Sequence, residues 1–149
     1  MYTFVLAVHN LVRWLALFLG IFALVRSVGG WLGGRPWINT DRKAGIFFTS
    51  AMDLQLLLGL ALYFFLSPIT RTALGDLASA MSQDGLRFFA LEHSIYMLLA
   101  VVFAHLGSLL PKKMSEDRAK HQRAAIFFLL AGLALLLGMP WMRPVFPIF

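Results

Sequence analysis

Three ionisable side chains interrupt one apolar stretch of the sequence. Residues 91–107 read LEHSIYMLLAVVFAHLG and contain Glu92, His93 and His105 among mostly apolar neighbours. At the depth of a lipid bilayer an ionisable group is costly unless a partner, a ligand or water compensates it. Three such groups in one apolar segment therefore indicate that the function of the chain is organised around this segment.

A fourth ionisable group of interest, His9, lies in another apolar stretch near the N-terminus. If both stretches cross a membrane inward as helices, His9 lies roughly 9 Å and His93 roughly 8 Å below the outer boundary. Two neutral imidazoles at one depth suit axial ligation of a haem iron, whose apolar ring would lie along the axis of a helix bundle. The spacing thus predicts haem b between His9 and His93.

The surroundings of His9 fit this hypothesis. Arg13 follows His9 by one helical turn on the same face. A buried guanidinium needs an anion, and either Glu92 or a haem propionate would supply it.

Other helices carry a small residue, Gly59, and a polarisable one, Met97, near the residues of interest. Gln55 and Gly59 share a stripe, and Gly59 leaves room for a ring or for a close helix. Met97 continues the face of His93 and offers a soft contact. The alternative needs no cofactor: His9, Arg13, Gln55 and Glu92 would form a hydrogen-bonded network that joins the helices. Both interpretations stay open on these residues alone.

A second polar pair is expected deeper in the bundle. His105 follows His93 by 12 residues, which places it roughly 18 Å deeper along a helix. Asp53 has a comparable depth on the preceding apolar run, so the two side chains are expected to pair. Such a pair would be structural or would relay protons from a quinone or porphyrin site. His121 lies in a basic connector and is expected to be solvated.

The composition places these residues in a membrane protein. Apolar residues make up 60% of the 149 residues and charged residues 13%, whereas soluble domains are about a quarter charged. Four apolar runs are each long enough to cross roughly 30 Å of hydrocarbon as a helix; they are residues 3–25, 44–66, 88–110 and 124–142. The sequence predicts a single all-α domain, an integral membrane four-helix bundle. The absence of cysteine excludes disulfides and thiolate ligands.

The distribution of basic residues predicts the orientation. The first and third connectors hold nine of them: Arg26, Arg35, Arg42, Lys43, Lys112, Lys113, Arg118, Lys120 and Arg123. The other side holds Arg71, Arg87 and Arg143. The positive-inside rule then places both termini outside and the basic loops in the cytoplasm, in a bacterial inner membrane. Charges in these loops fit anionic lipid, not nucleic acid.

The connectors themselves carry local signals. Residues 26–43 contain four glycines and a proline, typical of an interfacial connector with Trp31 and Trp37 as headgroup anchors. Residues 39–41 offer an N-cap for the second helix. Residues 74–81 follow helical spacing, which predicts one short interfacial helix on the outer side before a turn at 84–85. This helix would be a lid over a site or a cover for helix ends.

The segments HNLVRW, LQLLLGLALYF, LRFFALEHSIYMLLAV and KHQRAAIFF…PW resemble small four-span bacterial membrane proteins labelled cytochrome b-like. The resemblance covers nearly the whole chain. More distantly, the layout is similar to HemJ-type protoporphyrinogen oxidases and CopD-like membrane domains, and it implies that His9 matches their first-helix histidine and that haem is bound. The HemJ-type oxidases also rely on a lysine after the first helix, whereas Lys43 here lies at the cytoplasmic end of the second.

These observations predict a membrane b-type haem protein that takes part in electron transfer, with a quinone as a further candidate cofactor. The chain would be a small subunit of a larger membrane complex, a role favoured over that of an independent enzyme. Two alternatives remain: a haem-free accessory subunit of a respiratory or photosynthetic complex, and a porphyrinogen-oxidising enzyme. The apolar tail after residue 139 would anchor in the interface or dock on partner subunits.

Overall fold

The computed structural model describes residues 1–141, and these are helical throughout apart from short connections. The four long helices are α1 (Tyr2–Gly33), α2 (Asn39–Ala61), α6 (His93–Leu109) and α7 (Asp117–Gly138). Three short ones, α3 (Pro68–Gly75), α4 (Leu77–Met81) and α5 (Asp84–Arg87), join α2 to α6. Two π-helical turns, η1 (Leu62–Leu66) and η2 (Phe88–Glu92), and one 3₁₀ turn, η3 (Leu110–Lys113), extend the long helices.

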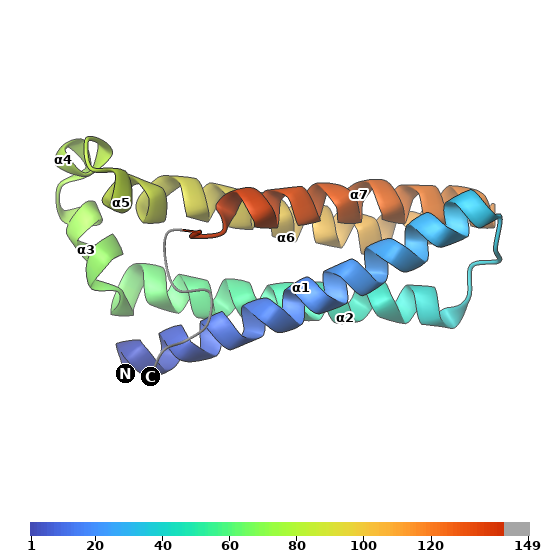
Figure 1. Cartoon of the computed structure of the whole chain (residues 1–149), viewed down its shortest axis with the longest axis horizontal. Helices are drawn as coiled ribbons and strands as arrows, with labels where there is room; N and C mark the ends of the chain where they lie inside the picture. Colours follow the sequence, from blue (N-terminus) through green and yellow to red (C-terminus); the bar gives the residue numbers. More distant parts are fainter. Residues whose placement is uncertain (142–149) are drawn as a thin grey trace.

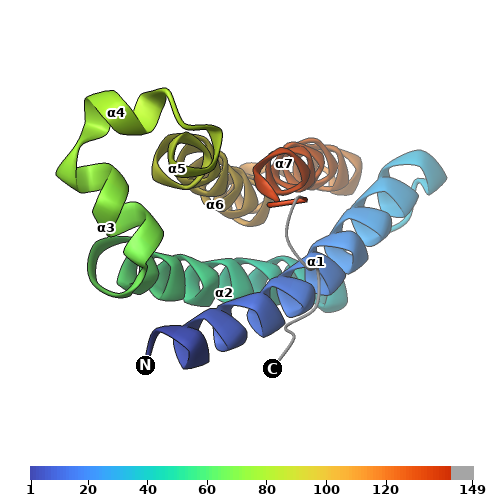
Figure 2. The same cartoon turned by 60° about the vertical axis from the view of Figure 1, so that its left-hand side comes forward.

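The long helices form an antiparallel bundle (Figure 1). Helix α1 packs beside α2 and α7, and α6 packs beside the same two helices. Helices α1 and α6 therefore face each other diagonally across the bundle (Figure 2). Four continuous segments are long and apolar enough to cross a membrane, namely Tyr2–Gly33, Asn39–Leu66, Asp84–Lys113 and Asp117–Gly138. The predicted all-α four-helix bundle with four candidate membrane spans is confirmed.

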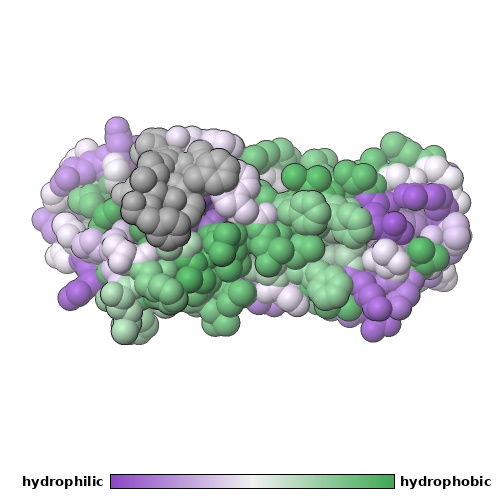
Figure 3. Space-filling model, turned by 60° about the horizontal axis from the view of Figure 1, so that its bottom comes forward, coloured by the Kyte–Doolittle hydropathy of each residue, from purple (hydrophilic) through white to green (hydrophobic). Residues whose placement is uncertain are grey.

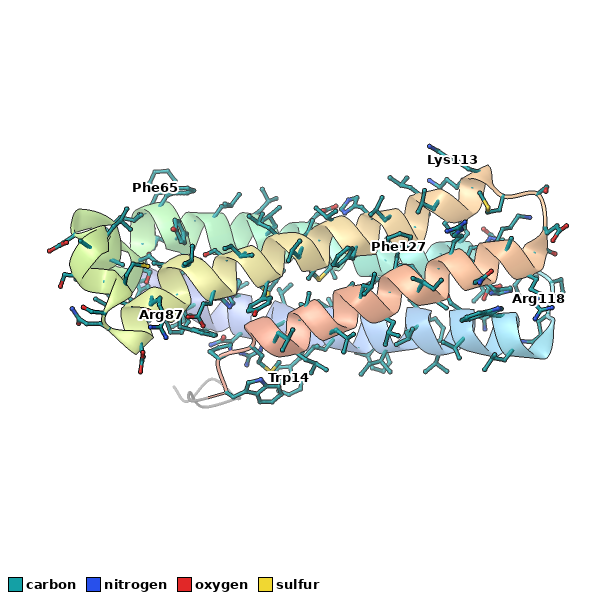
Figure 4. The ribbon with its side chains drawn as sticks, turned by 90° about the horizontal axis from the view of Figure 1, so that it is seen from above. Trp14, Phe65, Arg87, Lys113, Arg118 and Phe127 are labelled. Atoms are coloured by element: carbon teal, nitrogen blue, oxygen red, sulfur yellow. The ribbon has the colours of Figure 1, made fainter. Side chains whose placement is uncertain are left out.

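The surface has the pattern of a membrane protein. Figure 3 shows a broad apolar belt between more hydrophilic ends. Lys113 and Arg118 lie at one end of the bundle and Arg87 at the other (Figure 4); we call the first the basic end and the second the α3–α5 end. Buried core positions are mostly small, including Ala16, Ala23, Ala100, Ala104 and Ala131. Small residues let helix backbones approach closely, which is how helices associate where lipid already solvates the large apolar side chains.

Helix α1 is longer than the sequence predicted. Residues 26–33 continue it, so the connector to α2 is residues 34–38 and not the whole stretch 26–43. Gly34 ends the helix in the left-handed conformation, with φ +62°, and its N–H bonds the carbonyl of Gly30. This conformation costs glycine little because it has no Cβ.

The expectation that His121 is solvated was wrong. Its side chain is 1% exposed, and its ring centroid lies 4.8 Å from that of Trp37. A Cβ on Gly30 would collide with the imidazole, so the glycine provides the space that His121 fills. The extended α1 reaches the start of α7 and creates this contact, which also turns Trp37 into a packing partner of His121.

The start of α2 is capped differently from the prediction. The helix begins at Asn39, and Asp41 is its third residue. The Asp41 carboxylate accepts a 3.0 Å hydrogen bond from the backbone N–H of Ile38 and a 2.7 Å bond from Nε of Arg26. Asp41 therefore joins the last turns of α1 to the first turn of α2.

Three short helices replace the single interfacial helix predicted before residue 84. The second span ends before Ser67 and Pro68 as predicted, because Ser67 caps α3 and Pro68 occupies its first turn. Asp76 caps α4 by accepting from the N–H of Ser79. The predicted turn at 84–85 forms the beginning of α5. The end of the predicted fourth span and the apolar tail beyond Trp141 lie outside the described residues.

Candidate functional site

The halves of the long helices next to the α3–α5 end line a cavity of about 450 Å³. Its walls come from α1, α2, α6 and α7, and Ile69 and Thr70 of α3 contribute at one end. Most of the lining is apolar. The polar exceptions are Tyr2, Thr3, His9, Asn10, Arg13, Gln55, Tyr63, Ser67, Thr70 and His93.

His93 enters this cavity with one ring nitrogen fixed. Its Nδ1 lies 2.7 Å from the backbone oxygen of Gly138. A carbonyl oxygen only accepts hydrogen bonds, so Nδ1 carries the proton and Nε2 keeps a free lone pair. A backbone carbonyl that holds one nitrogen of an imidazole is the usual support of a metal-ligating histidine.

Gly138 makes this contact possible. A Cβ there would collide with Cε of Met97 and come within 2.8 Å of the Cβ of Tyr96. The glycine therefore lets α7 approach α6 closely enough for its carbonyl to reach His93.

His9 faces the cavity from the diagonally opposite helix and is bound by Gln55. Nε2 of Gln55 lies 3.0 Å from the backbone oxygen of His9 and 3.3 Å from His9 Nε2. A carbonyl oxygen only accepts hydrogen bonds, so the NH2 group of Gln55 donates one hydrogen to the His9 carbonyl. Its other hydrogen is donated to Nε2 of His9. His9 Nε2 is then an acceptor, and the proton of the neutral ring lies on Nδ1.

Two buried polar atoms at this place have no hydrogen-bond partner among the described residues. They are Nδ1 of His9 and Oε1 of Gln55. A buried polar group without a partner costs about 1–3 kcal/mol. Unsatisfied atoms on the wall of a cavity therefore indicate a position for a ligand or for water.

The cavity brings together most residues that the sequence singled out. His9, Arg13, Gln55, Gly59, His93 and Met97 all line it. A Cβ on Gly59 would lie 3.5 Å from Cε1 of His9, an ordinary van der Waals contact, so Gly59 lies directly beside the imidazole.

Glu92 is placed elsewhere. Its carboxylate forms a 2.8 Å ion pair with Nε of Arg87, and it is not part of the cavity wall within residues 1–141. The Glu92 carboxylate, which was one candidate anion for Arg13, is thus paired with Arg87 at the α3–α5 end.

Tyr63 is a lining residue that the sequence analysis missed. Its hydroxyl donates a 2.8 Å hydrogen bond to the carbonyl of Ala90, in the π-helical turn η2. Thr70 donates in turn to the carbonyl of Tyr63 at 2.7 Å. The sequence could have indicated this position for Tyr63. It follows Gln55 and Gly59 at intervals of four residues, which places the three on one helix face.

A second cavity, of about 260 Å³, lies between α2 and α6. It shares His9, Gln55, Gly59, Tyr63, His93 and Met97 with the first. Its lining also includes Leu60, Phe64 and Leu98, which are 40%, 54% and 51% exposed. The site is therefore lined in part by residues of the apolar outer surface between these two helices.

Asp53 and His105 lie apart from both cavities. Nε2 of His105 is 3.4 Å from Oδ1 of Asp53, and their side chains are 39% and 51% exposed. The predicted contact between them is present, but it lies on the outer surface of the bundle and not in its core.

The described residues offer no cluster of three or more histidines and carboxylates for a bare metal ion. Comparison of the chain with protein-family models, with curated proteins and with solved structures finds no match.

Proposed function

We propose that the chain is an integral membrane b-type haem protein that takes part in electron transfer, in which His9 and His93 would hold the haem iron. The observation that carries this proposal is the pair of imidazoles that face one apolar cavity from diagonally opposite helices. Bound haem would supply the one-electron chemistry at its iron. The chain would supply ligands, orientation and a dry surrounding.

The protonation of the two rings supports the assignment. His93 donates from Nδ1 to Gly138, and His9 accepts at Nε2 from Gln55. Both neutral rings thus carry their proton on Nδ1 and a lone pair on Nε2, the form that binds iron. Ligation by His9 replaces only the 3.3 Å contact with Gln55, whose amide keeps its bond to the His9 carbonyl.

The cavity also fits an apolar ring with acidic substituents. Its volume of about 450 Å³ is within the range of roughly 300–1,000 Å³ usual for ligand sites. Arg13 lines the same cavity, and a guanidinium is well suited to a propionate carboxylate. Its cation lies 5.7 Å from the ring centroid of Trp14, which helps to hold it in an apolar surrounding.

We further infer a small subunit of a larger complex in a bacterial inner membrane, with a quinol as the electron donor. The second cavity supports a lipid-soluble donor, since residues of the outer apolar surface line it. The two cavities share His9 and His93, so a quinol in the second cavity would lie beside the residues that hold the haem.

A difference spectrum tests the proposal directly. The protein, purified from a haem-sufficient host, should show a b-type reduced-minus-oxidised spectrum and about one haem per chain by pyridine haemochrome. Folded protein without a Soret band would contradict the ligand assignment. The chain would then be a haem-free accessory subunit whose polar residues hold the helices together.

The orientation has its own test. A periplasm-dependent reporter fused after Phe149 should be active, and so should one inserted at Ser82 in the connection between α4 and α5. A cytoplasm-dependent reporter at Lys113 should be active because basic loops stay inside. The reverse pattern at all three positions would place the histidines on the cytoplasmic half of the membrane.

A further inference from the structure

The two histidines of the cavity differ in how the chain supports their rings. Nδ1 of His93 donates to the carbonyl oxygen of Gly138 at 2.7 Å, which fixes the ring and leaves the lone pair of Nε2 for a ligand. Gly138 is a buried residue of α7. A hydrogen bond of this kind orients a metal-ligating histidine and raises its basicity. His93 therefore has the support that a permanent metal ligand needs.

His9 lacks this support. Its Nδ1 is buried, and the described part of the chain gives this atom no hydrogen-bond partner. Its Nε2, the nitrogen with the lone pair, accepts from the Gln55 amide at 3.3 Å. His9 can therefore bind a metal only by giving up that hydrogen bond, and its ring proton on Nδ1 stays without an acceptor from these residues.

Gln55 also stabilises the ring of His9 when Nε2 is not bound to a metal. A lone pair without a donor is costly in an apolar cavity, and the Gln55 amide is placed to supply the donor. The side chain is held there, because the same amide donates to the backbone oxygen of His9 at 3.0 Å. Gln55 is 7% exposed, so water competes little for this bond. The chain thus provides a resting position for the His9 ring.

The second cavity connects this place with the lipid-facing surface. Both histidines and Gln55 line it, together with Leu60, Phe64 and Leu98, which are exposed on the outer surface of α2 and α6. Apolar solutes leave water for hydrocarbon. A small apolar molecule dissolved in the bilayer therefore meets an apolar cavity that ends at the less firmly supported histidine.

We propose that His93 is the permanent ligand of the haem iron and that His9 is displaceable, its place being taken by a small neutral diatomic molecule from the lipid. This inference rests on the haem site proposed above. The exchange breaks the bond between iron and Nε2 of His9 and forms one between iron and the incoming molecule. The iron keeps its oxidation state, and no proton moves. Nε2 of His9 then accepts from Gln55, at the position found in the structure.

Carbon monoxide is the probe, because it is neutral, apolar and a ligand of reduced haem iron. It should shift the Soret band of the reduced protein and replace the spectrum of the two-histidine form. In His9→Ala the haem content should stay near that of the wild type, with high-spin iron. Carbon monoxide should then bind at least about tenfold more tightly, because no side chain competes for the iron. In His93→Ala most of the haem should be lost.

Gln55→Leu tests the resting position. Without the amide donor the displaced ring of His9 is unpaired, so the affinity for carbon monoxide should fall roughly three- to tenfold, the scale of one interhelical hydrogen bond in a membrane. Thr49→Ala is the matched control. Thr49 is a buried polar residue of α2 whose hydroxyl bonds carbonyls of its own helix, and its loss should leave the affinity unchanged. Circular dichroism establishes that each variant is folded.

The outcomes separate this inference from the haem site on which it rests. Four results would overturn the inference while the haem site stands. They are a low-spin haem that carbon monoxide leaves unchanged, equal loss of haem in the two histidine variants, greater loss in His9→Ala than in His93→Ala, and equal affinities in Gln55→Leu and Thr49→Ala. Folded wild-type protein without haem would contradict both proposals.

Discussion

His9→Ala and His93→Ala are each expected to abolish the low-spin b-type spectrum of the purified protein. Both residues line the cavity; if they hold a haem iron as proposed, each substitution would remove one of the two nitrogen ligands that a low-spin spectrum requires. The absorption spectrum and the haem content per chain measure the effect. This is the largest change that we expect from any single substitution, because the protein would either lose the haem or lose the low-spin form of its iron.

The remaining histidines provide the controls. His105 pairs with Asp53 on the outer surface, and His121 is buried against Trp37 at the basic end. His105→Ala and His121→Ala should therefore keep the spectrum in all protein that folds. Loss of the spectrum in these variants but not in His9→Ala would show that the ligands were assigned to the wrong residues.

Arg13→Leu gives a graded result at the same site. Removing a cation near the ring should stabilise the oxidised, more positive iron and lower the midpoint potential without loss of haem. Potentiometric titration measures the shift. An unchanged potential with normal haem content would indicate that the guanidinium lies outside the field of the iron.

The four spans could be predicted because each is a long apolar run, but the end of α1 could not. Residues 29–34 contain four glycines, and glycine inside a helix costs about 1 kcal/mol relative to alanine. Local propensity therefore favours a break. Packing overrides it, because Gly30 gives His121 the space for its ring. A contact between positions 91 residues apart is invisible to a pattern that is read along the chain.

The grouping of these side chains around one cavity could be predicted where it depends on regular helix geometry. His9 and Arg13 share one face of α1, and Gln55 and Gly59 share one face of α2, so their common cavity follows from intervals of four. Glu92 ends the π-helical turn η2. A π-turn holds one more residue than an α-turn and changes the direction of side chains around it. Glu92 accordingly pairs with Arg87.

The second large effect is expected at the junction of α1 and α2. Asp41→Ala should destabilise the protein by about 2 kcal/mol, less than for a fully buried ion pair because Arg26 is partly exposed. The Asp41 side chain is 2% exposed and that of Arg26 is 24% exposed. The substitution leaves the guanidinium and the N–H of Ile38 without this acceptor. Thermal unfolding in detergent, followed by circular dichroism, measures the loss.

Two further variants separate the charge from the cap. Asp41→Asn keeps an oxygen that can accept from Ile38 N–H but removes the charge that attracts Arg26, so it should recover part of the lost stability. Asp117→Ala removes another carboxylate that pairs with a basic residue, Lys120, at 2.8 Å. That pair lies within one helix and its carboxylate is 42% exposed, so the loss should be much smaller. Equal destabilisation by Asp41→Ala and Asp117→Ala would mean that the junction does not depend on the buried carboxylate.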